Sequence, residues 1–147
     1  MMSLLPVIPL STLIAFVQED APFGDVTTET VVGSRLCEAE IIAREKLVIA
    51  GLSEISALFT YYGVQTRSSF HDGDLVERET VILSLSGPAQ AILLVERTAL
   101  NLMGRMSGIA TRTREISRIV AEIDPVCRIA ATRKTAPGLR LADKKAA

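Results

Sequence analysis

The sequence of 147 residues contains no tryptophan, and only 4% of its residues are aromatic. Because aromatic rings are the platforms on which single-stranded nucleic acids stack, this scarcity argues against such a partner. Hydrophobic residues make up 48% of the chain and charged residues 22%, which is the mixture of a globular chain and excludes disordered, collagen-like and coiled-coil sequences. The length indicates one domain or slightly more.

Cysteine and histidine are also scarce. Cys37 and Cys127 have apolar neighbours and form no Cys-x-x-Cys motif, and His71 is the only histidine. We therefore expect two buried free thiols in a reducing compartment and no zinc site. A single histidine in a turn cannot anchor a Ser/His/Asp triad, and neither a GxGxxG motif nor a P-loop is present.

The apolar N-terminus, residues 1–17, lacks the features of a targeting segment. It has no basic region, it contains Pro6 and Pro9, and the polar residues Gln18, Glu19 and Asp20 follow at once. These features argue against a signal peptide and against a membrane-spanning helix. We expect a cytoplasmic protein with no membrane partner.

Charge is distributed unevenly along the chain, although the net charge is −1. Residues 1–96 contain 5 Lys and Arg against 13 Asp and Glu, a balance of −8. Residues 97–147 contain 11 against 4, a balance of +7. The C-terminal part is therefore expected to meet an anionic ligand, an acidic partner surface or nucleic acid. Nucleic acid is the least favoured of these, because no aromatic residues interleave the basic ones.

The first part of the chain, residues 1–88, predicts an α+β unit built around a mostly antiparallel sheet. Ser11 is a suitable N-cap for a helix that ends near Asp20. Apolar and polar residues alternate from Cys37 to Ala43, as in a strand with one buried face. Further elements are a helix over 51–62 and strands over 64–70, 75–76, 81–85 and 89–95.

Residues 96–147 predict one or two helices followed by a buried strand. Apolar residues recur at helical spacing over 96–123, with a possible restart at Ser107-Gly108, and Asp124-Pro125 ends the helix. The run 126–131 is apolar without clean alternation, which is typical of a parallel strand covered on both sides.

The strongest candidate site is the run TRKTAPGLR at 132–140. Ligands of α/β proteins bind at the carboxyl ends of parallel strands. Arg133 offers a planar fork and Lys134 a point charge, and both suit carboxylates or phosphates. A solvated basic turn is the alternative explanation for this run.

Arg97 is a second candidate, since it lies where the predicted strand becomes a helix. A salt bridge at a helix start explains it equally well. The acidic residues Glu19, Asp20 and Asp25 around Gly24 could form a metal loop or an ordinary loop. A solvated helix face accounts for the arginines Arg105, Arg112, Arg114 and Arg118.

Five segments in order along the chain resemble the quinolinate phosphoribosyltransferase family, also called the carboxylating nicotinate-nucleotide pyrophosphorylases. Three are specific: ERTALNL at 96–102, SGIATRT at 107–113 and TRKTAPGLR at 132–140. The segments 19–27 and 43–52 add to the match. The resemblance begins at about residue 18 and continues to the end of the sequence.

The resemblance implies an N-terminal α+β sandwich domain over residues 1–95. It further implies that residues 96–147 are the linking helices and the first strand of an open, TIM-like α/β barrel that is incomplete here, and that the subunits work as homodimers. It implies transfer of phosphoribose from phosphoribosyl pyrophosphate to quinolinate with decarboxylation, a step of NAD synthesis in which Mg²⁺ accompanies the donor. By resemblance, Thr132, Arg133 and Lys134 bind the substrates, and Arg133 and Lys134 are catalytic. Arg97 is expected to reach the site of the neighbouring subunit.

The sequence departs from the family pattern in two ways. Ala131 stands where the family often has Asp, and the acidic metal-binding and His-Arg segments of the barrel would lie after Ala147. A complete barrel needs about 200–250 residues. We therefore expect the N-terminal half of such an enzyme, inactive alone and poorly ordered over about 133–147 unless another chain supports it.

Two alternative functions remain open at this point. One is a related pyrophosphorylase-like protein of the molybdenum-transport type, which would differ in pocket residues that mostly follow Ala147. The other is a non-catalytic module for dimerisation or anion binding.

Overall fold

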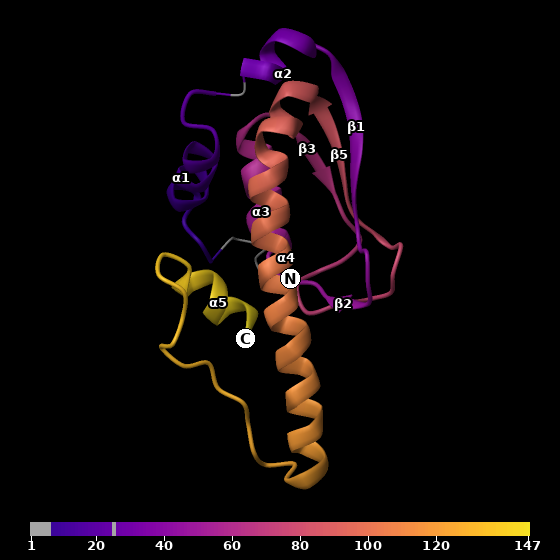
Figure 1. The fold of residues 1–147 in the computed structure, drawn as a ribbon. Coiled ribbons are helices and arrows are strands. Elements are labelled where there is room, and N and C mark those ends of the chain that lie inside the picture. Colours follow the sequence, from indigo (N-terminus) through magenta and orange to yellow (C-terminus); the bar gives the residue numbers. More distant parts are fainter. Residues whose placement is uncertain (1–6, 25) are drawn as a thin grey trace.

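A computed structural model describes residues 7–24 and 26–147. Helix α4 (Ala89–Ile123) runs the length of the molecule, with the strands beside its first half and α1 and α5 on another side (Figure 1). The other elements are α1 (Leu10–Asp20), α2 (Val26–Val31), β1 (Leu36–Ile42), β2 (Leu47–Val48), α3 (Leu52–Tyr61), β3 (Gln65–Arg67), β4 (Leu75–Val76), β5 (Val81–Pro88) and α5 (Arg140–Ala146).

The strands form two antiparallel sheets, which confirms the expected α+β arrangement. The larger sheet has the order β1-β5-β3, and β2 pairs with β4 in the smaller one. In the β1–β5 register Glu38 lies opposite Ser86 and Ala39 opposite Leu85. Because successive side chains of a strand point to opposite faces, the acidic residues of β1 lie on the solvent face and the apolar ones face the helices.

One hydrophobic core joins the sheet to α1, α3, α4 and α5. The side chains buried most completely come from four different elements, and burying each one stabilises the fold by about 1.5–3 kcal/mol. They include Leu13, Ile55, Leu58, Phe59, Leu83, Val95 and Met106. Helix α1 begins at Leu10 after Pro9 with no side-chain cap, so the predicted Ser11 cap is wrong.

Helix α4 differs from its prediction in two places. The strand predicted over 89–95 is wrong, because Ala89, Ile92, Val95 and Ala99 are buried at a spacing of three and four residues, which is a helical period. The helix also continues through Ser107-Gly108 without a break. Its end at Asp124, before Pro125, is as predicted.

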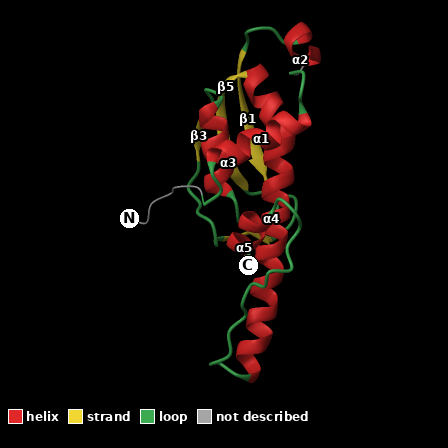
Figure 2. Cartoon of the chain, turned by 90° about the vertical axis from the view of Figure 1, so that its left-hand side faces the viewer, coloured by secondary structure: helices red, strands yellow, loops and turns green. Residues whose placement is uncertain are grey.

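The chain after α4 contains no strand, since residues 124–147 are loop except for α5. Residues 126–131 are exposed, so the predicted buried parallel strand is wrong. A strand needs a hydrogen-bonded neighbour, and this segment returns along the distal half of α4, away from the sheet (Figure 2). Cys127 lies in it and is exposed, contrary to the expected burial; both cysteines are free.

Helix α5 lies within residues 133–147, for which we expect poor order unless another chain supports them. Ala142 and Ala146 are buried in the main core, and α5 packs against α4. The start of a barrel is not present in residues 124–147, and α4 runs across the predicted domain boundary between residues 95 and 96.

Gly51 should be the least replaceable glycine in the described part of the chain. Its φ is +92°, and a Cβ atom there would lie 2.9 Å from Met106 Sδ. Gly73 has a similar φ of +97° but open space around it, so Gly73→Ala measures the backbone strain alone. We predict that Gly51→Ala lowers the free energy of unfolding by about 1–3 kcal/mol more than Gly73→Ala. Equal losses in urea denaturation would show that the close approach of α4 is unimportant.

Candidate functional site

The basic run at 132–140 forms an exposed loop between α4 and α5. The Lys134 N–H donates to Thr132 Oγ1 at 3.0 Å, and Arg140 Nε donates to Thr135 Oγ1 at 3.4 Å. The charged groups of Arg133 and Lys134 form no ion pair within the part of the chain that the structure describes. Both cations are therefore available to an anion from outside.

Arg97 lies well inside α4 rather than at a helix start, and it is engaged by an acid. Its Nη1 donates to both carboxylate oxygens of Asp20, at 3.2 and 3.3 Å. The arginine side chain is 73% exposed, and such surface pairs contribute only about 0–1 kcal/mol. An incoming anion could therefore replace Asp20 at little cost.

Arg105 was predicted to be solvated, but it makes the best-formed ion pair of α4. Its Nε and Nη2 donate to the two carboxylate oxygens of Asp143, at 2.8 and 2.9 Å. Asp143 Oδ2 also accepts the Ala136 N–H at 3.0 Å. The hydrogen bonds from Arg105 hold the pKa of Asp143 below its usual value against the opposing effect of burial, with further help from Ala136. The same carboxylate raises the pKa of Arg105.

A second charged cluster attaches α5 to α3. Lys145 Nζ lies 2.5 Å from Glu54 Oε2 and 2.7 Å from Asp72 Oδ2, and it donates to Ser53 Oγ at 2.7 Å. Glu54 is fully buried, and its other oxygen accepts the Val7 N–H at 2.9 Å. Burial raises the pKa of the Glu54 carboxyl, but Lys145 and the two further donors outweigh it and hold that pKa below its ordinary value.

Sequence reasoning missed both clusters. Asp143 is separated from Arg105 by 38 positions and Lys145 from Glu54 by 91, so no local pattern connects the partners. The one available signal was the apolar sequence around Glu54 on the predicted helix 51–62, which indicates that this carboxylate is buried and needs a partner.

A hollow of about 410 Å³ lies beside Arg105 on α4. Asn101 and Arg105 line it from α4, Asp20 from the end of α1, and Leu139 from the end of the basic run. Asp20 also lines the neighbouring hollow that contains Arg97. The structure thus places Arg97 and the end of the basic run along adjacent hollows, without bringing Arg97 into contact with Arg133 or Lys134.

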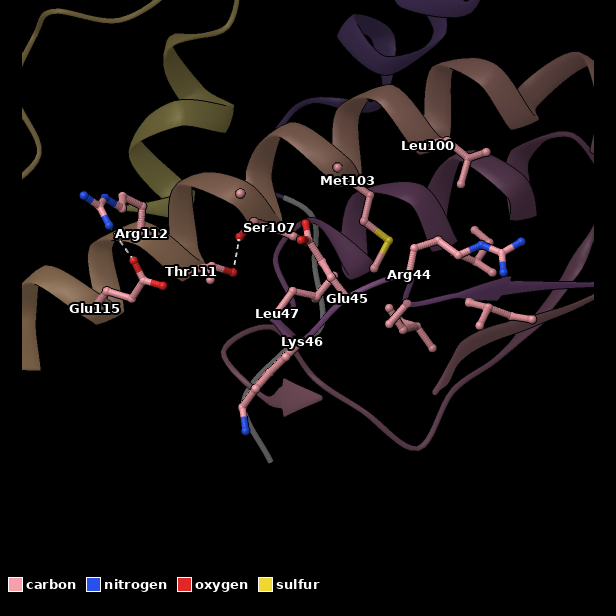
Figure 3. A pocket seen from close by; sticks show the side chains of 16 residues that line it. Arg44, Glu45, Lys46, Leu47, Leu100, Met103, Ser107, Thr111, Arg112 and Glu115 are labelled. Carbon is pink, nitrogen blue, oxygen red and sulfur yellow. Dashed lines mark hydrogen bonds and ion pairs between the residues drawn. The ribbon is translucent and has the colours of Figure 1, made fainter. Parts of the chain in front are cut away.

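A further hollow, of about 430 Å³, lies between α4 and the β1–β2 connection (Figure 3). Its cations already have acidic partners: Arg112 Nη1 lies 2.7 Å from Glu115 Oε2, and Lys46 Nζ lies 2.5 Å from Glu77 Oε1. Its hydroxyls bind the backbone, since Ser107 Oγ accepts the Ala50 N–H and Thr111 Oγ1 accepts the Val48 N–H. The run SGIATRT therefore joins α4 to the residues around β2.

No three His, Cys, Asp or Glu side chains among residues 7–24 and 26–147 come together as metal ligands. Asp25, which belonged to the possible metal loop, lies outside the described residues. His71 lies in an exposed turn, where its backbone N–H donates to the Asp74 carboxylate. In the same part of the chain, no helix has the length and hydropathy needed to span a bilayer.

The comparison with protein families decides what the chain is related to. A family model described as "Quinolinate phosphoribosyl transferase, N-terminal domain" matches residues 25–107, more than half of the sequence. This chain belongs to the quinolinate phosphoribosyltransferase family. The motifs that suggested the resemblance thus identified the family correctly.

Individual relatives agree with that assignment. A probable carboxylating nicotinate-nucleotide pyrophosphorylase of Bacillus subtilis is 43% identical over 133 residues, which are 89% of this chain and 45% of the relative. The crystal structure of the nicotinate-nucleotide pyrophosphorylase of Ehrlichia chaffeensis matches 95% of this chain and 52% of its own, with a TM-score of 0.85 and 31% identity. The Francisella tularensis enzyme gives a TM-score of 0.83 at 28% identity, with 95% and 51% covered. The chain spans about half the length of the curated relatives it matches.

Removing the cation from the α3–α5 cluster should be severe. We predict that Lys145→Met lowers the free energy of unfolding by about 3–5 kcal/mol, because it leaves the Glu54 carboxylate buried without its cation. Lys144→Met, at the exposed neighbouring position, should change it by less than about 0.5 kcal/mol. Adding Glu54→Leu to Lys145→Met should recover part of the loss. Similar urea midpoints for the two lysine variants would contradict this role.

The carboxylates Glu54 and Asp143, one in each charged cluster, should make stability depend on pH. The pKa values of Glu54 and Asp143 are lowered in the folded chain, so the stability they contribute is present above their unfolded pKa values of about 4. It is lost as the pH falls through their lower folded pKa values. The free energy of unfolding should therefore fall on acidification below pH ~4, and the double variant Glu54→Leu/Lys145→Met should show a shallower fall. Identical pH profiles would contradict the prediction.

Proposed function

We propose that this chain supplies part of the substrate site of a phosphoribosyltransferase that joins quinolinate to phosphoribose in NAD synthesis. The observation that carries the proposal is the pair Arg133–Lys134, which lies in the family's TRKT run and has no acidic partner among the described residues. Family membership supports the reaction type.

The charges of the proposed substrates suit this surface. Quinolinate is a dicarboxylate and phosphoribosyl pyrophosphate carries several more negative charges, so a site for both has to be cationic. The guanidinium of Arg133 can donate two parallel hydrogen bonds to a carboxylate. The ammonium of Lys134 is a compact positive charge that can bind phosphate oxygens. Thr132 adds a hydroxyl next to them. Residues 97–147 have an excess charge of +7, and Arg133 and Lys134 are two of its cations that form no ion pair among the described residues.

In the proposed reaction the ring nitrogen of quinolinate forms a bond to C1 of the ribose. The bond from C1 to the pyrophosphate oxygen breaks, and pyrophosphate leaves with the electron pair. The carboxylate beside the ring nitrogen then departs as CO₂, its bonding electrons stay on the ring carbon, and a proton replaces it. Arg133 and Lys134 would lower the barrier by holding the charge that grows on pyrophosphate, and by orienting the dicarboxylate towards the ribose.

Arg97 is proposed to serve the site of a second subunit in a homodimer. Its guanidinium is largely exposed on α4 and is held only by the weak pair with Asp20. It could therefore exchange Asp20 for a substrate carboxylate presented by the partner. Mg²⁺ is expected to arrive with the phosphoribosyl donor, and no step of the proposal runs through it.

The function can be tested by fusing residues 1–147 to the remaining C-terminal part of the Bacillus subtilis relative. We predict that the isolated chain releases no CO₂ from quinolinate, whereas the fusion does so only when both substrates are present. Arg133→Ala and Lys134→Ala should each reduce kcat/KM of the fusion by about 10- to 100-fold, the value of a charged hydrogen bond. Arg118→Ala, which removes an exposed charge on α4, is the control.

Four outcomes would overturn parts of the proposal. A folded fusion that ignores quinolinate would exclude the function, and stabilisation by molybdate rather than quinolinate would favour the molybdenum-transport alternative. Full activity of both alanine variants would exclude the assigned residues. Turnover by the isolated chain would show that no further segment is required.

A further inference from the structure

The loop that carries Arg133 and Lys134 is attached to the rest of the molecule almost immediately after the basic pair. Residues 126–131, before the pair, are exposed. After it, the Ala136 N–H donates to Asp143 Oδ2 at 3.0 Å, and the Leu139 N–H closes a turn by donating to the Ala136 carbonyl at 3.1 Å. The first attachment of this loop to the body is thus two residues beyond Lys134.

Two sets of hydrogen bonds hold Asp143 where it can accept the Ala136 N–H. Its own backbone N–H donates to the Leu139 carbonyl at 2.9 Å, which starts α5. Its carboxylate is fixed by the two-point contact with Arg105, and a bidentate arginine pair defines the orientation of the carboxylate as well as its position. Asp143 is only 8% exposed, so water competes poorly for its oxygens.

Holding α5 against the body does not by itself require this pair. Lys145 already binds Glu54 and Asp72, and Ala142 and Ala146 are buried in the core. What Asp143 adds is an acceptor for the backbone of the basic loop. Arg105 lies eight positions after Arg97 in α4, and two helical turns separate them by roughly 12 Å along the axis. The pair therefore fixes the basic loop relative to the helix that carries Arg97.

We propose that Asp143, oriented by Arg105, is a positioning residue that sets the place of Arg133 and Lys134 against helix α4. The proposal rests on the proposed function for the identity of the anions, but the placement of the loop can be measured without them. Asp143 itself touches no substrate in this scheme, and it acts through the Ala136 amide.

The test uses the ¹⁵N-labelled 147-residue chain and three variants. Asp143→Ala removes the acceptor. The double variant Arg105→Asp/Asp143→Arg restores opposite charges between α4 and α5, but it places a donor where Ala136 needs an acceptor. Lys144→Ala is the matched surface control. For each protein we would measure the thermal midpoint, hydrogen exchange of the Ala136 amide, the amide shifts of Arg133 and Lys134, and titrations with quinolinate and with inorganic pyrophosphate.

We expect Asp143→Ala to accelerate exchange at Ala136 by about tenfold and to weaken binding of both anions by about three- to tenfold. The charge-swapped variant should recover the thermal midpoint without recovering exchange protection or anion affinity. Recovery of all three would show that the pair is only a structural clamp and would overturn the proposal. If Asp143→Ala does not fold, the charge-swapped variant carries the same comparison.

Failure of the proposed function would look different. If the unmodified chain binds neither anion, the substrate assignment is contradicted, and the amide data alone decide the positioning role. Faster exchange at Ala136 with moved Arg133 and Lys134 signals in the charge-swapped variant would then support that role. Unchanged exchange and signals would overturn it.

Discussion

The architecture depends on the hydroxyl contacts between the middle of α4 and the short segment around β2. Ser107 Oγ accepts the Ala50 N–H at 3.1 Å and donates to the Ala50 carbonyl at 3.3 Å, and Thr111 Oγ1 accepts the Val48 N–H at 2.9 Å. These backbone groups belong to a two-stranded sheet and its exit, where few partners exist. By satisfying them, α4 joins the small sheet and the start of α3 to the rest of the fold. Gly51 permits this approach because it carries no Cβ atom.

At the C-terminal end, ion pairs add to the hydrophobic core in holding α5 against the rest of the fold. Helix α5 is short and contributes few apolar side chains, and two charged clusters, one around Lys145 and one around Asp143, hold it. The Lys145–Glu54 pair is buried and depends on its additional donors, because an isolated buried carboxylate would be strongly disfavoured. The Arg105–Asp143 pair is nearer the surface and reaches the loop that carries the basic residues.

Local pattern predicted much of the first 88 residues. The alternation from Cys37 to Ala43 identified β1, and the spacing of Leu52, Ile55, Leu58 and Phe59 identified α3. In contrast, the apolar run 89–95 fits either a strand or a buried helix by its sequence pattern alone. In the structure it is the first part of α4 and is continuous with the helix predicted over 96–123. The run 126–131 failed for another reason, since its apolar residues have no neighbouring strand in this chain.

The candidate site was predictable in its residue types but not in its supports. Two adjacent cations after an apolar run point to an anion, and the family motif names them. That Asp143 would hold their loop could not be foreseen, because its partner Arg105 lies 38 positions earlier in the sequence and on a different helix. Long-range pairs of this kind arise from tertiary packing alone.

The order β1-β5-β3 leaves both outer strands of the main sheet with unpaired backbone groups. Such edges invite addition of further strands and hence aggregation. β3 offers only three residues, and β1 carries Glu38 and Glu40. A second β1 aligned beside the first would bring these carboxylates together, and their repulsion disfavours that pairing.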